Sequence, residues 1–145
     1  MKITIIGGGN IGGAIAGGLA ASTLMKASDL TVADPSAAAL ERIKGLNSAI
    51  RTSQDNAAAV EGADLIILAV KPWLAEEVSA TFRDKLNFDR QCLASVVAGV
   101  SFEKLKTMLD NGKDVRPALL RLIPNTAISL RESVTFIASD GASES

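Results

Sequence analysis

Apolar and polar positions follow a regular order along the chain, with short β-branched runs succeeded by segments of helical spacing. A strand at 2–6 runs into glycines, and a helix over 10–21 follows, in which Ile11, Ile15 and Leu19 share one face. Polar residues and a proline stop the strand at 30–33, and Ser36 is placed to cap the next helix.

The same order continues to the end of the chain. Further strands are predicted at 49–51, 65–70, 92–97, 119–123 and 134–138, and further helices over 53–61, over 74–82 and after Ser101. Strands that alternate with helical segments are typical of βαβ units and a parallel sheet covered on both faces. We therefore predict a single α/β domain over 1–138, a doubly wound (Rossmann) and mostly parallel sheet, and a polar tail over 139–145 that frays.

The composition excludes several kinds of catalytic and metal-binding site. The 145 residues include no His, no Tyr and one Cys, which excludes a His-based triad, a His or Cys-cluster metal site, a Tyr proton donor and a disulfide within this chain. A net charge of −1 without a basic stripe argues against nucleic acid as a partner. Because the apolar runs are too short to span a bilayer and the N-terminus lacks the pattern of a signal peptide, we expect no membrane partner and a cytoplasmic protein.

The turn after the first strand contains the spacing G-x-G-x-x-G as Gly7, Gly9 and Gly12. Gly7 would allow a tight turn, Gly9 would let a pyrophosphate approach bare backbone, and Gly12 would let the helix pack on the strand. The start of that helix offers free N–H groups and the positive end of the helix dipole to the pyrophosphate. An isolated glycine string can also be a plain turn, but this one joins a strand to a helix, which favours dinucleotide binding.

Two further positions lie at predicted strand ends. Asp34, 22 residues after Gly12, is placed to accept hydrogen bonds from the ribose hydroxyls and to repel a 2′-phosphate, which favours NADH; it could instead start an Asx turn. Lys71 leaves the strand at 65–70 beside Pro72, either next to a cofactor or acidic substrate or as a surface charge. Trp73 is interpreted as a rim or packing aromatic.

Four ordered blocks carry a family resemblance. I-G-G-G-N-I-G at 6–12, A-V-K-P at 69–72, A-G-V at 98–100 and R-L-I-P-N-T at 121–126 resemble the N-terminal domain of pyrroline-5-carboxylate reductases along essentially the whole chain. The resemblance implies reduction of 1-pyrroline-5-carboxylate to L-proline by NADPH or NADH. It also implies a homo-oligomer formed through a helical C-terminal domain, which supplies most of the substrate pocket and which we expect this chain to lack.

The resemblance also assigns residues to parts of the cofactor. It implies a pyrophosphate contact at the glycine turn, a ribose contact at Asp34, an adenosine contact at Asn56, and ribose and nicotinamide contacts from the later blocks. Without it, Asn56 would be taken for a helix-start residue and Asn125 for a turn residue. The cofactor-binding residues predicted in this way are Ile6, Gly7, Gly8, Gly9, Asn10, Ile11, Gly12, Asp34, Asn56, Ala69, Val70, Lys71, Pro72, Val97, Ala98, Gly99 and Asn125.

Two positions depart from the family pattern. Many relatives carry Ser or Thr at position 34, where a hydroxyl tolerates the 2′-phosphate of NADP better than Asp34 does. The second proline of the family's Met-Pro-Asn-Thr-Pro block is replaced by Ala127. The first departure leaves the choice between NADH and NADPH open, with Asp34 favouring NADH.

No catalytic residue is assigned from the sequence. A protonated cyclic imine accepts a hydride without a strong protein acid, which suits a chain that has no His and no Tyr. We expect this chain alone to be inactive. A non-catalytic dinucleotide-binding module and the nucleotide domain of a related imine or hydroxyacid reductase are the alternatives.

Overall fold

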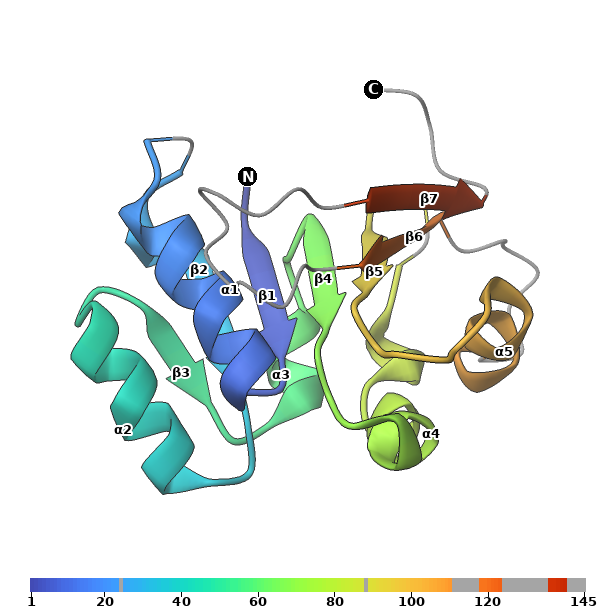
Figure 1. Ribbon diagram of the computed structural model, residues 1–145, viewed down its shortest axis with the longest axis horizontal. Coiled ribbons are helices and arrows are strands. Elements are labelled where there is room, and N and C mark those ends of the chain that lie inside the picture. The colour runs from blue at the N-terminus through green and yellow to red at the C-terminus, as the bar shows by residue number, and fades with distance from the viewer. Residues whose placement is uncertain (24, 88, 111–117, 124–135, 141–145) are drawn as a thin grey trace.

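The computed structural model describes residues 1–23, 25–87, 89–110, 118–123 and 136–140. Within them, seven strands form one sheet in the order β3-β2-β1-β4-β5-β6-β7 (Figure 1). Strands β1 to β6 pair in parallel, and β7 is antiparallel to β6. The strands are β1 (Ile3–Ile6), β2 (Leu30–Ala33), β3 (Arg51–Ser53), β4 (Leu65–Leu68), β5 (Cys92–Ser95), β6 (Ala118–Ile123) and β7 (Phe136–Asp140). The predicted α/β fold with a mostly parallel sheet is confirmed.

Helices cover both faces of this sheet (Figure 1). One buried cluster joins sheet residues to α1 and α2, and a second cluster joins them to α3, α4 and α5. The helices are α1 (Asn10–Ala21), α2 (Ala37–Leu46), α3 (Asn56–Val60), α4 (Ala75–Ala80) and α5 (Phe102–Met108), with 3₁₀ turns at Ala27–Asp29, Pro72–Leu74 and Arg83–Lys85. This is the doubly wound arrangement, in which a ligand crevice forms beyond the carboxyl ends of the strands.

Alternation along β1 shows why all four residues of the strand are buried. Ile5 belongs to the cluster under α1 and α2, whereas Ile6 belongs to the cluster under α3 to α5. Both are almost fully buried, and each contributes about 1.5–3 kcal/mol by leaving water. Thr4 shares the α3 face, where its hydroxyl donates to the carbonyl of Ala59 at 2.7 Å. The polar group in the buried strand is therefore satisfied, and the bond joins β1 to α3.

Several predicted bounds are wrong by a few residues. The third strand was expected at 49–51, but pairing with β2 starts at Arg51 and the preceding Ile50 is a buried loop residue. The strands expected at 65–70 and 92–97 end at Leu68 and Ser95. The last strand, expected at 134–138, is seen as Phe136–Asp140, so it extends into the expected tail; 134 and 135 lie outside the described residues.

Two predicted helices are also shorter. The helix expected over 53–61 is Asn56–Val60, because Asp55 caps it by accepting from the N–H of Ala58 at 3.2 Å. The helix expected over 74–82 is divided between the 3₁₀ turn Pro72–Leu74 and α4. In α1, Ile15 is buried as predicted. Ile11 was predicted to share its face of the helix, but it is 37% exposed.

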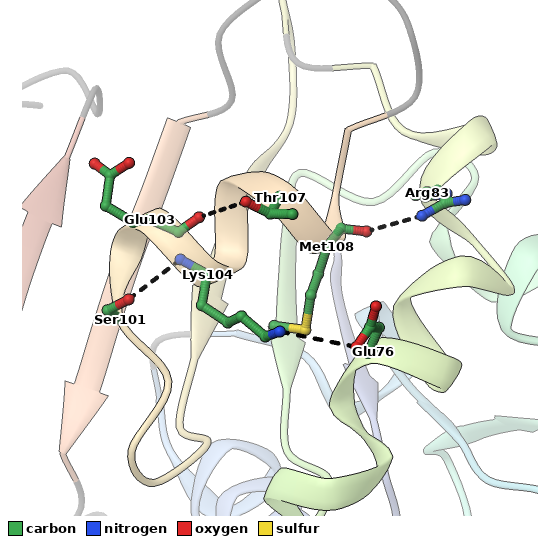
Figure 2. Close-up of polar contacts among 7 residues, drawn as sticks. All are labelled: Glu76, Arg83, Ser101, Glu103, Lys104, Thr107 and Met108. Carbon is green, nitrogen blue, oxygen red and sulfur yellow. Dashed lines mark hydrogen bonds and ion pairs between the residues drawn. The ribbon is translucent and has the colours of Figure 1, made fainter.

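Polar contacts join α4, the turn that follows it, and α5 (Figure 2). The ammonium of Lys104 lies 3.8 Å from a carboxylate oxygen of Glu76, and the Arg83 guanidinium donates to the carbonyl of Met108 at 3.4 Å. Ser101 caps α5 by accepting from the N–H of Lys104, as predicted. The Lys104–Glu76 pair is exposed, so it contributes at most about 1 kcal/mol. Apolar packing by residues such as Leu105 therefore holds α5 on the sheet.

Among the residues that the structure describes, no helix is long and apolar enough to cross a membrane.

Candidate functional site

A cleft of about 270 Å³ opens beyond the carboxyl ends of β1, β2 and β4, beside the first turn of α1. Its walls come from the glycine turn, the end of β2, the start of α3, and the segment that joins β4 to α4. The lining residues are Ile6, Gly7, Gly9, Asn10, Ile11, Asp34, Pro35, Asn56, Ala69, Val70, Lys71, Leu74 and Val78. Residues far apart in sequence thus meet where an open α/β sheet binds its ligand.

The three glycines Gly7, Gly9 and Gly12 differ in what a side chain at each position would contact. Gly7 has φ +112°, a conformation that side chains disfavour, and a Cβ there would overlap the carbonyl of Ala69. A Cβ on Gly12 would overlap the carbonyl of Gly7, so the close approach of α1 to the turn requires glycine. A Cβ on Gly9 would meet nothing within 4 Å. Packing within the protein therefore explains Gly7 and Gly12, whereas the missing side chain of Gly9 enlarges the cleft.

The first turn of α1 lacks the side-chain cap that three other helices have. Gly9 occupies the cap position, makes no side-chain hydrogen bond, and is followed by no acidic residue in the first turn. By contrast, α2, α3 and α5 are capped by Ser36, Asp55 and Ser101. The first N–H groups of a helix have no partner inside the helix, and here they lie at the cleft. This end of α1 can hold an anion through backbone N–H groups and the helix dipole.

Asp34 is fixed between the glycine turn and the start of α2. One carboxylate oxygen accepts from the N–H of Gly8 at 2.7 Å, and the other accepts from the N–H of Ser36 at 2.8 Å. The second bond is the Asx turn that the sequence left as an alternative. Because Asp34 also lines the cleft, the turn does not remove the carboxylate from it. Each oxygen keeps a free lone pair that can accept from a ligand hydroxyl.

On the opposite wall, the segment after β4 supplies a positive charge and apolar surface to the cleft. The N–H of Ala69 donates to the carbonyl of Ile6 at 2.8 Å, which holds this segment against the glycine turn. Lys71 is the only cation among the described lining residues, and Asp34 is the only carboxylate. Leu74 and Val78 add an apolar wall that the sequence analysis missed. Their spacing of four was visible, but it is equally typical of a helix face turned to the core.

Asn56 also reaches the cleft, from the first residue of α3. Its Nδ2 donates to the hydroxyl of Thr81 at 3.0 Å. Asn56 is therefore both the first residue of a helix and a residue of the cleft, the two interpretations that the sequence allowed. Pro35, which had not been predicted, lines the cleft next to Asp34.

Other predicted site residues do not line the cleft. The N–H of Gly8 donates to Asp34, and Gly12 packs against the carbonyl of Gly7. Pro72 starts the 3₁₀ turn Pro72–Leu74. The predicted block Val97, Ala98 and Gly99 follows β5 outside the lining, with Val97 buried and the other two exposed. Trp73 is 76% exposed beside the cleft, in keeping with a rim position. Asn125 lies outside the described residues.

The residues present fit a nicotinamide dinucleotide. The bare backbone at Gly9 and the uncapped end of α1 suit a pyrophosphate, and the carboxylate at the end of β2 suits ribose hydroxyls. Leu74, Val78 and Val70 offer apolar contact to a ring. Within the described residues, no group of three or more metal-ligating side chains is present.

Known proteins resemble this chain along most of its length. It is 33% identical over 136 residues to a pyrroline-5-carboxylate reductase of Pasteurella multocida, an alignment that covers 92% of this chain and 47% of that protein. It is 34% identical over 139 residues to the Escherichia coli enzyme of the same name, covering 94% and 48%. The chain thus spans about half the length of these curated relatives.

A solved structure agrees with them. A pyrroline-5-carboxylate reductase from Coxiella burnetii superposes with a TM-score of 0.85 at 28% identity, over 99% of this chain and 51% of that chain. These matches confirm the resemblance that the four sequence blocks indicated. The family model described as NADP oxidoreductase, coenzyme F420-dependent, matches residues 2–99, from the start of β1 to the loop after β5. This chain therefore belongs to the NADP oxidoreductase, coenzyme F420-dependent family.

Proposed function

We propose that this chain is the cofactor-binding part of a pyrroline-5-carboxylate reductase, which reduces 1-pyrroline-5-carboxylate to L-proline with NADH or NADPH. The observation that carries the proposal is the cleft itself, in which an uncapped helix start, a bare glycine and a fixed carboxylate converge. The relatives support the choice of substrate, since both curated proteins that match most of this chain are named pyrroline-5-carboxylate reductase.

Each part of the cleft has a task in binding. The N–H groups at the start of α1 hold the pyrophosphate, and Gly9 lets it approach the backbone. Asp34 accepts hydrogen bonds from the adenosine ribose, and Asn56 contacts the same end of the molecule. Lys71 provides positive charge for the phosphates or for the carboxylate of the substrate. The bound cofactor supplies a hydride, and the chain orients it towards the acceptor.

We propose NADH as the preferred cofactor. The carboxylate of Asp34 would lie against a 2′-phosphate and repel it, whereas it can accept hydrogen bonds from the free ribose hydroxyl of NADH. We further propose that the ribose and nicotinamide are contacted by Val97, Ala98, Gly99 and Asn125. We also propose that the complete enzyme is a cytoplasmic homo-oligomer, formed through a helical domain outside this chain.

Calorimetric titration tests the binding step. NADH and NADPH are titrated separately into the full 145-residue chain, and we expect saturable one-to-one binding of both, tighter for NADH. If neither cofactor binds at millimolar concentration, the proposed function is wrong.

A second assay tests the substrate. The chain is fused to the remaining half of the Pasteurella multocida relative, and oxidation of NADH is followed with 1-pyrroline-5-carboxylate. We expect turnover by the fusion and none by the chain alone. A fusion that binds NADH but reduces no imine would favour the non-catalytic binding module.

A further inference from the structure

Thr81 lies outside the cleft but contacts a residue that lines it. It is the C-cap residue that follows α4, and it is exposed. The hydroxyl of Thr81 donates to the carbonyl of Val78, one turn earlier, and its oxygen accepts from Nδ2 of Asn56 at 3.0 Å. Asn56 is 25 residues away in sequence, at the start of α3. The hydroxyl thus joins the end of one helix to a cleft residue on another.

These two hydrogen bonds determine which way the amide of Asn56 points. A threonine hydroxyl has a single proton, and here it is committed to Val78. The oxygen of Thr81 can then only accept, so Asn56 must turn its NH₂ group towards it. The carbonyl oxygen Oδ1 is the end of the amide turned away from Thr81. The orientation of an asparagine amide is usually decided by such a network.

We infer that Thr81 is a positioning residue, which fixes Asn56 as an acceptor and thereby favours the cofactor without a 2′-phosphate. This inference rests on the proposed function. With the amide fixed towards Thr81, the group that Asn56 leaves for a ligand is its acceptor oxygen, and Asp34, which also lines the cleft, is a second acceptor. Two acceptors match the free 2′-hydroxyl of NADH, which can donate, and oppose a phosphate group, which has no proton to donate when fully ionised. A freely rotating amide would instead offer its N–H groups to a phosphate.

The test compares NADH and NADPH binding by calorimetry in Thr81→Val, which keeps the shape but removes the hydroxyl, and in Thr81→Ser, which keeps the hydroxyl. We expect Thr81→Val to weaken NADH binding about threefold to tenfold, the usual effect of losing one hydrogen bond, and to leave NADPH within twofold. Thr81→Ser should retain wild-type affinities. In an Asn56→Ala background, Thr81→Val should have no further effect, because the residue acts through that amide.

Thr107→Val is the matched control. Its hydroxyl also donates to a backbone carbonyl one turn earlier, that of Glu103 at 3.1 Å, but α5 contributes nothing to the cleft lining (Figure 2). This variant should bind both cofactors as the wild type does. Equal weakening of NADH and NADPH by Thr81→Val, or no change in either, would overturn the inference while the proposed function stands. A wild-type chain that binds neither cofactor would overturn the proposed function, and this inference with it.

Discussion

The starts of α1 and α5 differ in how their first N–H groups are satisfied, although both helices follow parallel strands at the same edge of the sheet. In α5, Ser101 caps the first turn and Glu103 places a negative charge in it (Figure 2). In α1, Gly9 provides no cap and the first turn contains no acid. The first turn of α5 therefore has a side-chain partner, whereas the first N–H groups of α1 are left open to water or to a ligand.

The two helix starts also differ in the contacts around them. The loop before α5 lies outside the cleft lining, and that helix is tied to α4 through Lys104 and Glu76. The loop before α1 is held by hydrogen bonds behind it, from Gly7 to Ala33 and from Gly8 to Asp34, which leaves its front open to the cleft. The start of α5 is closed by its own cap, and the start of α1 is open to the cleft.

Gly12→Ala should have the largest effect on the α1 side. Its Cβ would overlap the carbonyl of Gly7, a backbone atom that cannot move without opening the turn. We expect a loss of about 2–3 kcal/mol in the free energy of unfolding, measured in urea, and loss of NADH binding. Gly13→Ala is the control, since its Cβ would make an ordinary 3.6 Å contact with Ile43. It should raise stability by up to about 1 kcal/mol. Equal stabilities of the two variants would contradict the close approach.

Asp34→Ser should change cofactor choice, and it should also lower stability because the carboxylate accepts from the N–H groups of Gly8 and Ser36. Removing the carboxylate takes away a charge-assisted acceptor for the ribose hydroxyls and the repulsion of a 2′-phosphate. The ratio of NADPH to NADH dissociation constants should fall at least about tenfold, by calorimetry. Asp55→Ser removes a carboxylate outside the cleft and keeps a cap on α3, so it should leave that ratio unchanged. An unaltered ratio in Asp34→Ser would place the ribose elsewhere.

Ser101→Ala tests the α5 side. Loss of the cap should lower the free energy of unfolding by about 1 kcal/mol, measured by chemical denaturation, and leave NADH affinity unchanged. A large loss of NADH affinity would show that the start of α5 also takes part in binding, and the contrast between the two helices would fail.

The smallest effect concerns Cys92, at the start of the strand that leads to α5. Burial raises the pKa of this thiol above its ordinary value of 9.0, because the thiolate is poorly solvated there. Its contribution to stability is therefore present below that ordinary value and is lost as the pH rises through the higher pKa of the folded state. Alkylation by iodoacetamide at pH 8 should be slower in the folded chain than in urea. Equal rates would contradict the burial.

Much of the fold could be predicted because local patterns and the sheet agree. The helix over Asn10–Ala21 and the strand Leu30–Ala33 have the predicted bounds; glycines precede the helix, and Asp34 and Pro35 follow the strand. The third strand was misplaced because its start depends on pairing with Thr31 in β2, a contact that periodicity does not contain. The antiparallel pairing of β7 with β6 is likewise a contact that periodicity does not contain.

The candidate site could be predicted wherever backbone requirements leave a trace in the sequence. The glycine turn and Asp34 were predicted because their spacing, together with the strand before the turn and the helix after it, is typical of a dinucleotide site. Leu74 and Val78 were missed, since an apolar wall of a cleft has the same residue types as a core. Ile11 was expected to pack like Ile15, but it lies in the first turn of α1, beyond the sheet, and faces the cleft.

Gly9→Asp tests the contrast between the two helix starts most directly. The backbone at Gly9, with φ −77°, accepts a side chain, and aspartate is a good cap, so the variant should be as stable as the wild type or slightly more stable. Its carboxylate would occupy the N–H groups at the start of α1 and repel a pyrophosphate. Calorimetry should show NADH binding weakened at least about tenfold. Gly45→Asp, which adds the same charge to an exposed part of α2, should bind normally. A folded Gly9→Asp chain that binds NADH as tightly as the wild type would contradict the account.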